Sequence, residues 1–247
     1  MEKTILLQVA MEIECQEILT KLQNIQEINI NNYKYYKGTF NKFPIIISLS
    51  KVGLINASAS LILGIKEFNP TIIINTGIAG ATSKKLHIGD IVLGLECLNI
   101  NSYRTPIAKE GEGSNPQNWE LLTFLSGEED RIIKEQADKT LISLAKEINT
   151  NKFGKIYEGT IGSGDAWNRE VDRILYLNQK YNILCEDMES IATYTIANQQ
   201  NIPVISIKMI SDNSLTGEEY NRQVGKNLEE YIIEYLTKII KKQGTNL

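Results

Sequence analysis

Carboxylates recur in this sequence directly after apolar stretches that are typical of buried strands. Glu12 and Glu14 follow "TILLQVAM", Asp165 follows "YEGTIGSG", the stretch "CEDMES" (185–190) follows "NIL", and Asp212 follows "VISIKMIS". In open α/β sheets, ligands bind in the crevice beyond the carboxyl ends of the strands. Carboxylates that meet there repel one another unless they share a purpose. The pattern therefore predicts a ligand site that brings several acids together.

Each acid also has a purely structural interpretation. Glu12 and Glu14 fit the solvated face of a helix, and Asp212 in "SDNS" fits an Asx turn. Asp165 fits a bend that it closes by bonding to its own backbone. The three acids of "CEDMES" fit a helix N-terminus, where they complement the helix dipole. Residue types alone leave both interpretations open.

A glycine-rich stretch, "NTGIAGA" (75–81), follows another apolar run. Gly77 and Gly80 allow close approach of the backbone to a ligand or a positive φ. The stretch is not a Rossmann fingerprint and lacks the lysine of a P-loop. It predicts a glycine turn between two strands, and it is a weak signal by itself.

The elements that position these residues alternate between strand and helix patterns. Strands are expected at 4–9, 44–50, 71–75, 90–96, 155–164, 182–186 and 203–211. Helices are expected at 12–22, 55–68, 129–148, 170–179 and 188–198, and in a terminal amphipathic segment that contains Tyr220, Val224, Leu228, Tyr231, Tyr235 and Ile239. Residues 101–119 have turn composition and predict a long loop. The alternation predicts one α/β domain over 1–247, with three α/β/α layers around a central mixed or largely parallel β-sheet.

Composition excludes several functional classes. The net charge of −4 gives no electrostatic footprint for nucleic acid or for an anionic membrane. No apolar run reaches the about 20 residues that a membrane span requires, so a cytoplasmic protein is expected. The single His87 has no metal-ligand partners at suitable spacing, so no metal site and no cofactor are expected. Cys15, Cys97 and Cys185 lie far apart and predict reduced thiols.

Seven motifs in register resemble one family. They are "AMEIE" (10–14), "SKVGLINAS" (50–58), "INTGIAGA" (74–81), "IGDIV" (88–92), "GSGDAW" (162–167), "EDMES" (186–190) and "ISDNS" (210–214). Their order resembles that of purine nucleoside phosphorylases and nucleosidases, with the closest pattern in 5'-methylthioadenosine/S-adenosylhomocysteine nucleosidases. The resemblance implies a nucleoside phosphorylase-like fold, a homodimer, a small nucleoside as substrate, and hydrolysis of an adenine N-glycosidic bond. The transition state of that reaction resembles an oxocarbenium ion and requires two carboxyl groups.

The resemblance also implies roles for individual residues. Asp212 hydrogen-bonds the purine and donates a proton toward N7, a task that suits a carboxyl with a raised pKa. Glu14 is the base that activates water. Glu189 holds the ribose hydroxyls and Met188 lines the sugar. By this reading Glu186 and Asp187 remain structural residues at a helix start.

The remaining implied contacts surround the base. Trp167 replaces a usual Phe and stacks on the purine, while backbone groups of Asn168 read its edge. Gly80 and Ala79 form the wall beneath base and sugar. Two further residues complete the expected substrate-binding set: Val52 and Ser211, of which Ser211 supports Asp212.

Several positions depart from the family pattern. Ile78 stands where Ser or Thr is common, Lys208 stands where Arg is usual, and Asp187 shortens a common Glu. The 101–119 loop does not match the segment that closes the 5'-substituent pocket, so the 5' group of the substrate stays open. Two alternatives also remain: a phosphorylase of the same fold, for which no obvious arginine trio is present, and a non-catalytic nucleoside-binding protein.

Overall fold

The computed structural model describes residues 3–122, 132–148 and 152–244. Its strands are β1 (Ile5–Val9), β2 (Gln23–Ile30), β3 (Tyr33–Phe40), β4 (Phe43–Leu49), β5 (Ile72–Ala81), β6 (Ile91–Asn99), β7 (Tyr103–Arg104), β8 (Glu120–Leu121), β9 (Lys134–Gln136), β10 (Ile156–Ser163), β11 (Ile183–Asp187) and β12 (Val204–Asp212). Its α-helices are α1 (Gln16–Lys21), α2 (Leu54–Phe68), α3 (Lys139–Lys146), α4 (Val171–Tyr181), α5 (Ser190–Gln199) and α6 (Val224–Gly244).

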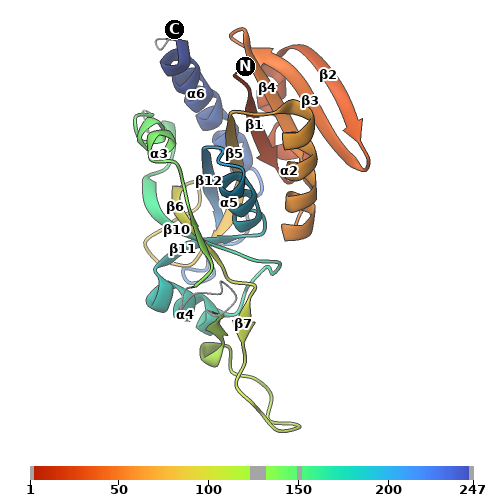
Figure 1. Ribbon diagram of the computed structural model, residues 1–247. Helices are drawn as coiled ribbons and strands as arrows, with labels where there is room; N and C mark the ends of the chain where they lie inside the picture. Colours follow the sequence, from red (N-terminus) through yellow and green to blue (C-terminus); the bar gives the residue numbers. More distant parts are fainter. Residues whose placement is uncertain (1–2, 123–131, 149–151, 245–247) are drawn as a thin grey trace.

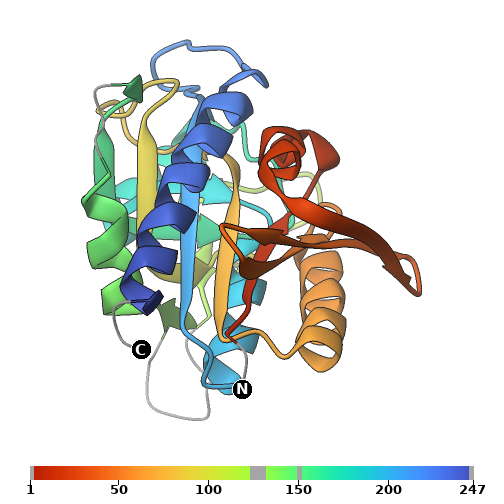
Figure 2. The same ribbon diagram turned by 90° about the horizontal axis from the view of Figure 1, so that it is seen from above.

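The main sheet is mixed and has the order β11-β10-β6-β12-β5-β1-β4-β3-β2, with β9 beside β6. Alternating side chains of its buried strands point to opposite faces, as the twofold period of a strand requires. Leu7 and Ile47 pack in one core with residues of α1, α3 and α6. Leu6 and Ile46 pack in a second core with residues of α2 and α5. The expected three layers around a mixed sheet are therefore confirmed, and Figures 1 and 2 show helices on both faces.

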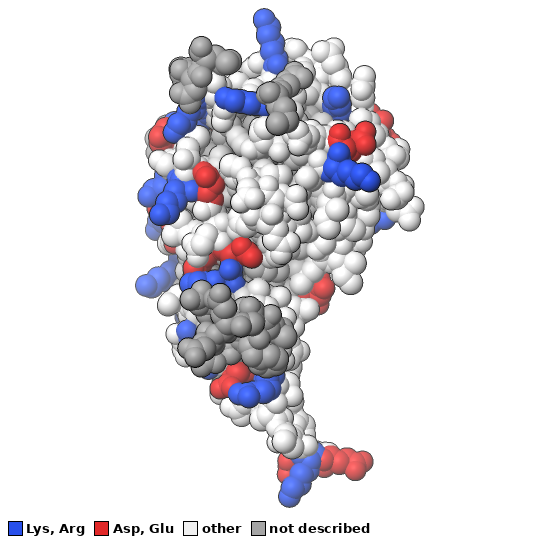
Figure 3. Space-filling model, viewed as in Figure 1, with Lys and Arg blue, Asp and Glu red and all other residues white. Residues whose placement is uncertain are grey.

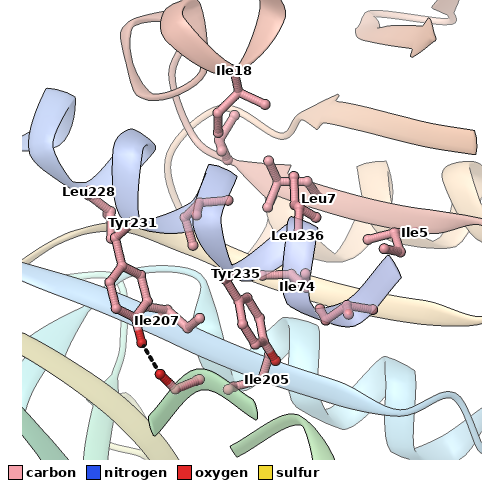
Figure 4. Packing of buried hydrophobic residues seen from close by; sticks show 14 of the residues in the cluster. Ile5, Leu7, Ile18, Ile74, Ile205, Ile207, Leu228, Tyr231, Tyr235 and Leu236 are labelled. Atoms are coloured by element: carbon pink, nitrogen blue, oxygen red, sulfur yellow. Dashed lines mark hydrogen bonds between the residues drawn. The ribbon is translucent and has the colours of Figure 1, made fainter. Parts of the chain in front are cut away.

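The long terminal helix α6 closes one face through two buried tyrosines. The hydroxyl of Tyr231 donates to the Ala145 carbonyl at 2.7 Å, the dashed line in Figure 4. The hydroxyl of Tyr235 donates to the Leu141 carbonyl at 2.9 Å. Because both acceptors lie in α3, these hydrogen bonds connect the two helices of this layer. The expected terminal helix is present, but it begins at Val224, so Tyr220 lies outside it.

Strand β11 changes the shape of the sheet. It pairs in parallel with β10 on one side and antiparallel with the distal end of β5 on the other. Strands β5, β12, β6, β10 and β11 therefore form a closed ring. The expected glycine turn is wrong, because "NTGIAGA" continues β5 as far as Ala81. Gly77 and Gly80 are therefore strand residues in the second half of β5, where Gly80 and Ala81 pair with β11.

Two other parts of the fold differ from the expectations, and the expected long loop is present. The hairpin of β2 and β3 was not predicted, because β2 is largely exposed and polar and lacks an apolar alternation. The helix expected at 129–148 is limited to α3 where the chain is described, because β9 occupies 134–136; residues 129–131 lie outside the described residues. The loop at 101–119 is confirmed as mostly irregular and projects from the foot of the molecule in Figure 1.

The surface carries charges of both signs. On the face shown in Figure 3, Lys and Arg alternate with Asp and Glu without a basic field. Within 3–122, 132–148 and 152–244, no helix has the length and apolar character to cross a membrane.

Candidate active site

A cavity lies beyond the ends of β1, β5, β11 and β12. Its wall includes all ten residues expected from the resemblance: Glu14, Val52, Ala79, Gly80, Trp167, Asn168, Met188, Glu189, Ser211 and Asp212. These residues are up to about two hundred positions apart in the sequence, so the sheet is what assembles them. Their individual roles stay predictions.

Glu14 lies in a single turn of 3-10 helix, Glu12–Glu14, directly after β1. Its Oε2 accepts hydrogen bonds from the backbone N–H groups of Ala10 and Met11, both at 3.0 Å, and Oε1 accepts one from Ile78 at 3.4 Å. A Cβ at position 77 would lie 2.9 Å from Oε1, so glycine is what lets β5 approach this carboxyl. The expectation of a solvated helix face therefore fails for Glu14, which is buried.

Burial raises the pKa of Glu14, although the positive charge of Lys208 and the backbone N–H donors act in the opposite direction. A carboxyl held by three donors is fixed in orientation. A raised pKa brings it closer to the range in which a group can accept a proton at neutral pH. Glu14 thus has the position and the chemistry of a general base.

Glu189 lies near Glu14 at the same end of the cavity. Its Oε1 accepts a hydrogen bond from the Gly53 N–H at 3.1 Å, which fixes the turn before α2 against the start of α5. Burial raises its pKa to about 7; Lys208 lowers that value and Asp187 adds to it. We call Glu14, Glu189, Asp187 and Lys208 the sugar-side cluster.

Asp187 and Lys208 form a buried ion pair. The Lys208 Nζ lies 2.7 Å from Asp187 Oδ2, and both side chains are 1% exposed. Burial alone would lower the pKa of Lys208, but the charges of Asp187, Glu189 and Glu14 raise it overall. The two departures from the family pattern, a shorter acid and a lysine in place of arginine, therefore meet as one buried ion pair.

The expectation for "CEDMES" as a helix start holds only in part. Asp187 is the last residue of β11, and its carboxylate accepts from the Ser190 N–H at 3.0 Å and from the Ser190 hydroxyl at 2.6 Å, which supports the first turn of α5. Both residues line the cavity, but Glu186 accepts a hydrogen bond from the Asn168 side chain, whereas Asp187 pairs with Lys208. Strand alternation separates the two: they are neighbours in β11 and point to opposite sides.

The other end of the cavity is built on β12. Asp212 Oδ1 accepts a hydrogen bond from the Ser211 hydroxyl at 2.7 Å, as expected for a supporting serine. A Cβ at position 80 would lie 3.4 Å from Asp212 Oδ2, so Gly80 leaves this carboxyl open to the cavity. We call Asp212, Ser211, Asn168 and Glu186 the base-side group.

Two aromatic rings border the cavity. Trp167 is 61% exposed, and its ring centroid lies 5.4 Å from that of Tyr220. Sequence reasoning placed Tyr220 in the terminal helix and so missed it as a cavity residue. Its apolar spacing with Val224 was the misleading signal. Met11, Ile78 and Glu186 are further lining residues that were not assigned to the site.

Not every strand-end acid joins the cavity. Asp165 Oδ1 accepts a hydrogen bond from the Leu54 N–H at 2.7 Å, so this carboxylate supports the N-terminus of α2. Glu12 Oε1 accepts from the Tyr36 hydroxyl at 2.9 Å. His87 contacts Glu218 at 3.0 Å, and the described residues contain no cluster of acids, His and Cys able to hold a metal ion.

The sequence as a whole matches a family model described as the phosphorylase superfamily, over residues 4–241. The chain belongs to the phosphorylase superfamily. A superfamily relative from Buchnera aphidicola, a 5'-methylthioadenosine/S-adenosylhomocysteine nucleosidase, is 30% identical over 241 residues, which cover 96% of this chain and 97% of the relative. The resemblance read from the seven motifs is thereby confirmed.

Solved structures of the superfamily share the fold. The nucleosidase from Neisseria meningitidis, in complex with methylthio-immucillin-A, has a TM-score of 0.77 at 22% identity and covers 95% of this chain and 98% of its own. The futalosine hydrolase of Helicobacter pylori has a TM-score of 0.76 at 21% identity and covers 97% of this chain and 98% of its own. At these identities the likeness shows the fold.

Proposed function

We propose that this protein is a purine nucleosidase that hydrolyses the N-glycosidic bond of 5'-methylthioadenosine, S-adenosylhomocysteine or a related 5'-modified adenosine. The products are adenine and a 5-substituted ribose. The observation that carries the proposal is one cavity with a buried, three-donor carboxyl, Glu14, in its sugar-side cluster and a second carboxyl, Asp212, in its base-side group. Relatives named as nucleosidases of these nucleosides support the same reaction.

Cleavage leaves negative charge on the departing adenine and positive charge on the ribose. Asp212 donates a proton toward N7 of the purine, so that adenine leaves as a neutral base. Ser211 fixes the orientation of Asp212 through the 2.7 Å hydrogen bond to Oδ1, which leaves Oδ2 free for the substrate. The exposed face of Trp167 stacks on the base, as expected from the sequence.

The sugar-side cluster serves the ribosyl cation and the attacking water. Glu14 accepts the proton of the water, and the N–H groups of Ala10, Met11 and Ile78 hold its carboxyl in place. Glu189 binds the ribose hydroxyls with the oxygen not used by Gly53. Carboxylates near the developing oxocarbenium ion also stabilise it electrostatically.

Hydrolysis is favoured over phosphorolysis by the charges around the cavity. A phosphate co-substrate generally needs Arg or Lys donors, and none of the described residues that line this cavity is Arg or Lys. Lys208 lies behind the wall in its ion pair with Asp187. Arg222 and Lys226 line a neighbouring cavity that also touches Glu14, and Lys226 is 3.2 Å from Glu17.

The deciding experiment is the release of free adenine from methylthioadenosine in phosphate-free buffer. We expect adenine without phosphate and no methylthioribose 1-phosphate when phosphate is added. Turnover only with phosphate would identify a phosphorylase, and tight binding without turnover would identify a nucleoside-binding protein. Parallel assays with S-adenosylhomocysteine and 6-amino-6-deoxyfutalosine rank the 5' groups.

The domain organisation, the assembly and the location of the whole chain also belong to the proposal. We propose that residues 1–247 act as a single nucleosidase domain that assembles as a homodimer in the cytoplasm. The dimer follows from the family resemblance, and sedimentation analysis of the purified protein tests it. The net charge and composition support a protein that binds a small nucleoside and neither nucleic acid nor membrane.

A further inference from the structure

Glu186 is a cavity-wall acid whose hydrogen bonding is incomplete. It lies in β11 between Gly162 of β10 and Gly80 of β5. Its Oε1 accepts a hydrogen bond from the Asn168 side-chain amide at 3.2 Å, whereas its Oε2 is buried without a partner among the described residues. A buried polar atom with no partner costs free energy, and such an atom in a cavity wall indicates that a ligand completes its hydrogen bonding.

The neighbours of Glu186 indicate which part of a ligand it meets. Under the proposed nucleosidase function, on which this inference rests, Asp212 is directed to N7, and the resemblance assigns backbone groups of Asn168 to the edge of the purine. Glu186 is hydrogen-bonded to the Asn168 side chain, so its carboxyl lies beside the residue that is expected to read the purine edge. Because Asn168 already occupies Oε1, Oε2 is the carboxyl oxygen left without a partner among the described residues.

We propose that Glu186 selects the base: Oε2 donates a hydrogen bond to a ring nitrogen of adenine when the carboxyl is neutral, and accepts one from the N1–H of a 6-oxopurine when it is ionised. A neutral carboxylic acid has one donor and spare acceptors, whereas a carboxylate only accepts. The ring N1 of adenine is an acceptor, and N1–H of a 6-oxopurine is a donor. One side chain therefore complements the two bases in its two protonation states.

The electrostatic surroundings place this change near neutrality. Burial raises the pKa of Glu186 to about 7, the charge of Asp212 on β12 adds to the rise, and the Asn168 amide and Arg173 on α4 oppose it. The Arg173 guanidinium donates to the carbonyls of Pro116 and Trp119, at 3.2 and 2.6 Å. Glu186 is thus neutral below about pH 7 and ionised above it.

Other titrating groups share the cavity and must be separated from Glu186. Glu14 and Glu189 both have raised pKa values, caused mainly by burial. Asp187 is the chain neighbour of Glu186 but points to Lys208. All of these groups are present in both the wild type and a Glu186 variant. The ratio of the base affinities of the two proteins therefore isolates the contribution of Glu186.

The test measures binding of free adenine and of hypoxanthine by calorimetry, from about pH 5.5 to about pH 8.5. Binding requires no turnover, so the outcome is independent of whether the protein hydrolyses methylthioadenosine. The quantity compared is the ratio of the wild-type affinity to the Glu186→Gln affinity. As pH rises across this range, we expect that ratio to fall about tenfold for adenine and to rise about tenfold for hypoxanthine. In Glu186→Gln the carbonyl oxygen keeps the hydrogen bond from the Asn168 amide, which leaves the NH2 group as a donor at every pH and fixes the preference for adenine.

Two variants complete the design. Glu186→Leu removes both hydrogen-bonding states and is expected to lose discrimination between the bases, which Glu186→Gln restores for adenine. Glu96→Gln is the matched control, because Glu96 is held on β6 by Thr160 and Gln136 and lies outside the cavity; it is expected to keep the wild-type pH profile. Melting curves show that each variant is folded.

The inference is overturned if the wild type and Glu186→Gln have the same pH dependence for both bases. It is also overturned if neither base binds, or if Leu discriminates as well as Gln. Failure of the nucleosidase proposal has a different signature: both bases bind with the expected pH dependence, yet methylthioadenosine is not hydrolysed.

Discussion

The two ends of the cavity are both rich in acid but handle charge differently. In the sugar-side cluster, three carboxyl groups surround Lys208, which is fully buried and paired with Asp187 at 2.7 Å. In the base-side group, the charge of Asp212 adds to the raised pKa of Glu186, and Arg173, which opposes that rise, donates to backbone carbonyls. The sugar-side cluster therefore holds its cation in a direct ion pair, whereas Arg173, the cation that acts on Glu186, donates to backbone carbonyls.

The difference matches the two charges that the reaction creates. Negative charge retained beside the ribose stabilises a developing cation. The positive charge of Lys208 offsets the electrostatic repulsion among the three close carboxyl groups. At the other end, the Ser211 hydroxyl orients Asp212, the proposed proton donor to the leaving base. In the proposed reaction, the ion pair of Lys208 and Asp187 thus lies at the end that carries the general base, and the proton donor lies at the other end.

The largest expected effect comes from removing the carboxyl group proposed for proton transfer at each end of the cavity in turn. Asp212→Asn and Glu14→Gln should each lower kcat/KM for methylthioadenosine about a thousandfold, since each removes a proton-transfer group. A nitrophenyl 5-methylthioriboside has a leaving group that needs no proton. With that substrate Asp212→Asn should recover most of its activity and Glu14→Gln should not.

Adenine and nitrophenolate release are measured by absorbance. Equal losses on both substrates for both variants contradict the assignment of one acid to each end.

Removing the cation of the sugar-side cluster should have the next largest effect. Lys208→Met leaves Asp187 buried and unpaired, and we expect it to lower the free energy of unfolding by about 3–5 kcal/mol. The double variant Lys208→Met/Asp187→Leu should recover much of that loss, because it removes both charges. Urea denaturation measures both. A single variant as stable as the wild type is incompatible with a buried, compensated pair.

The base-side group predicts a dependence of stability on pH. The pKa of Glu186 rises from 4.5 to about 7 on folding, so between these values the folded state binds more protons than the unfolded state. Stability from this group is therefore greatest below pH 4.5 and falls as pH rises toward 7. Glu186→Gln lacks this penalty and should be more stable than the wild type by about 1–3 kcal/mol at about pH 8.

The same variant should match the wild type in stability at the acidic end of the range. Thermal unfolding from pH 4.5 upward tests this sign. A variant less stable than the wild type at about pH 8 shows that the carboxylate is compensated.

The smallest effect belongs to an acid outside both ends. Asp165→Ala removes the carboxylate that accepts from the Leu54 N–H at the start of α2. We expect a loss of about 1 kcal/mol in stability, as for other helix caps, with kcat unchanged. Comparison of its melting curve and its adenine release with those of Asp212→Asn separates structural from functional strand-end acids. A large loss of kcat would place Asp165 in the site.

Much of the architecture was readable from local pattern. Apolar runs such as "TILLQV" and "VISIKMIS" became β1 and β12, because a strand buried on both faces is apolar throughout. The β2–β3 hairpin was missed because the burial of β2 is weak, so its sequence has no apolar alternation to detect. A helix was overextended before α3 because β9 has only three residues and is defined by pairing with β6.

The site was predicted through the motif resemblance, and its ten residues share one cavity. What sequence reasoning missed depends on contacts between distant residues. Glu186 was grouped with Asp187 as a helix start, but β11 pairs with both β10 and β5 and so turns the two carboxyls to opposite sides. Tyr220 was assigned by spacing to a helix that begins four residues later. No local signal separates these cases.

The closed ring of β5, β12, β6, β10 and β11 also constrains motion. A closed ring has no edge strand that can separate from the sheet, so the part of the cavity wall that carries Glu186 and Asp212 is not expected to open for a ligand. The rim differs, because Trp167 and Tyr220 are both exposed and meet in a single edge-to-face contact. Parting such a pair costs about 1 kcal/mol. The two side chains at the rim are therefore expected to separate more easily than the strands of the ring.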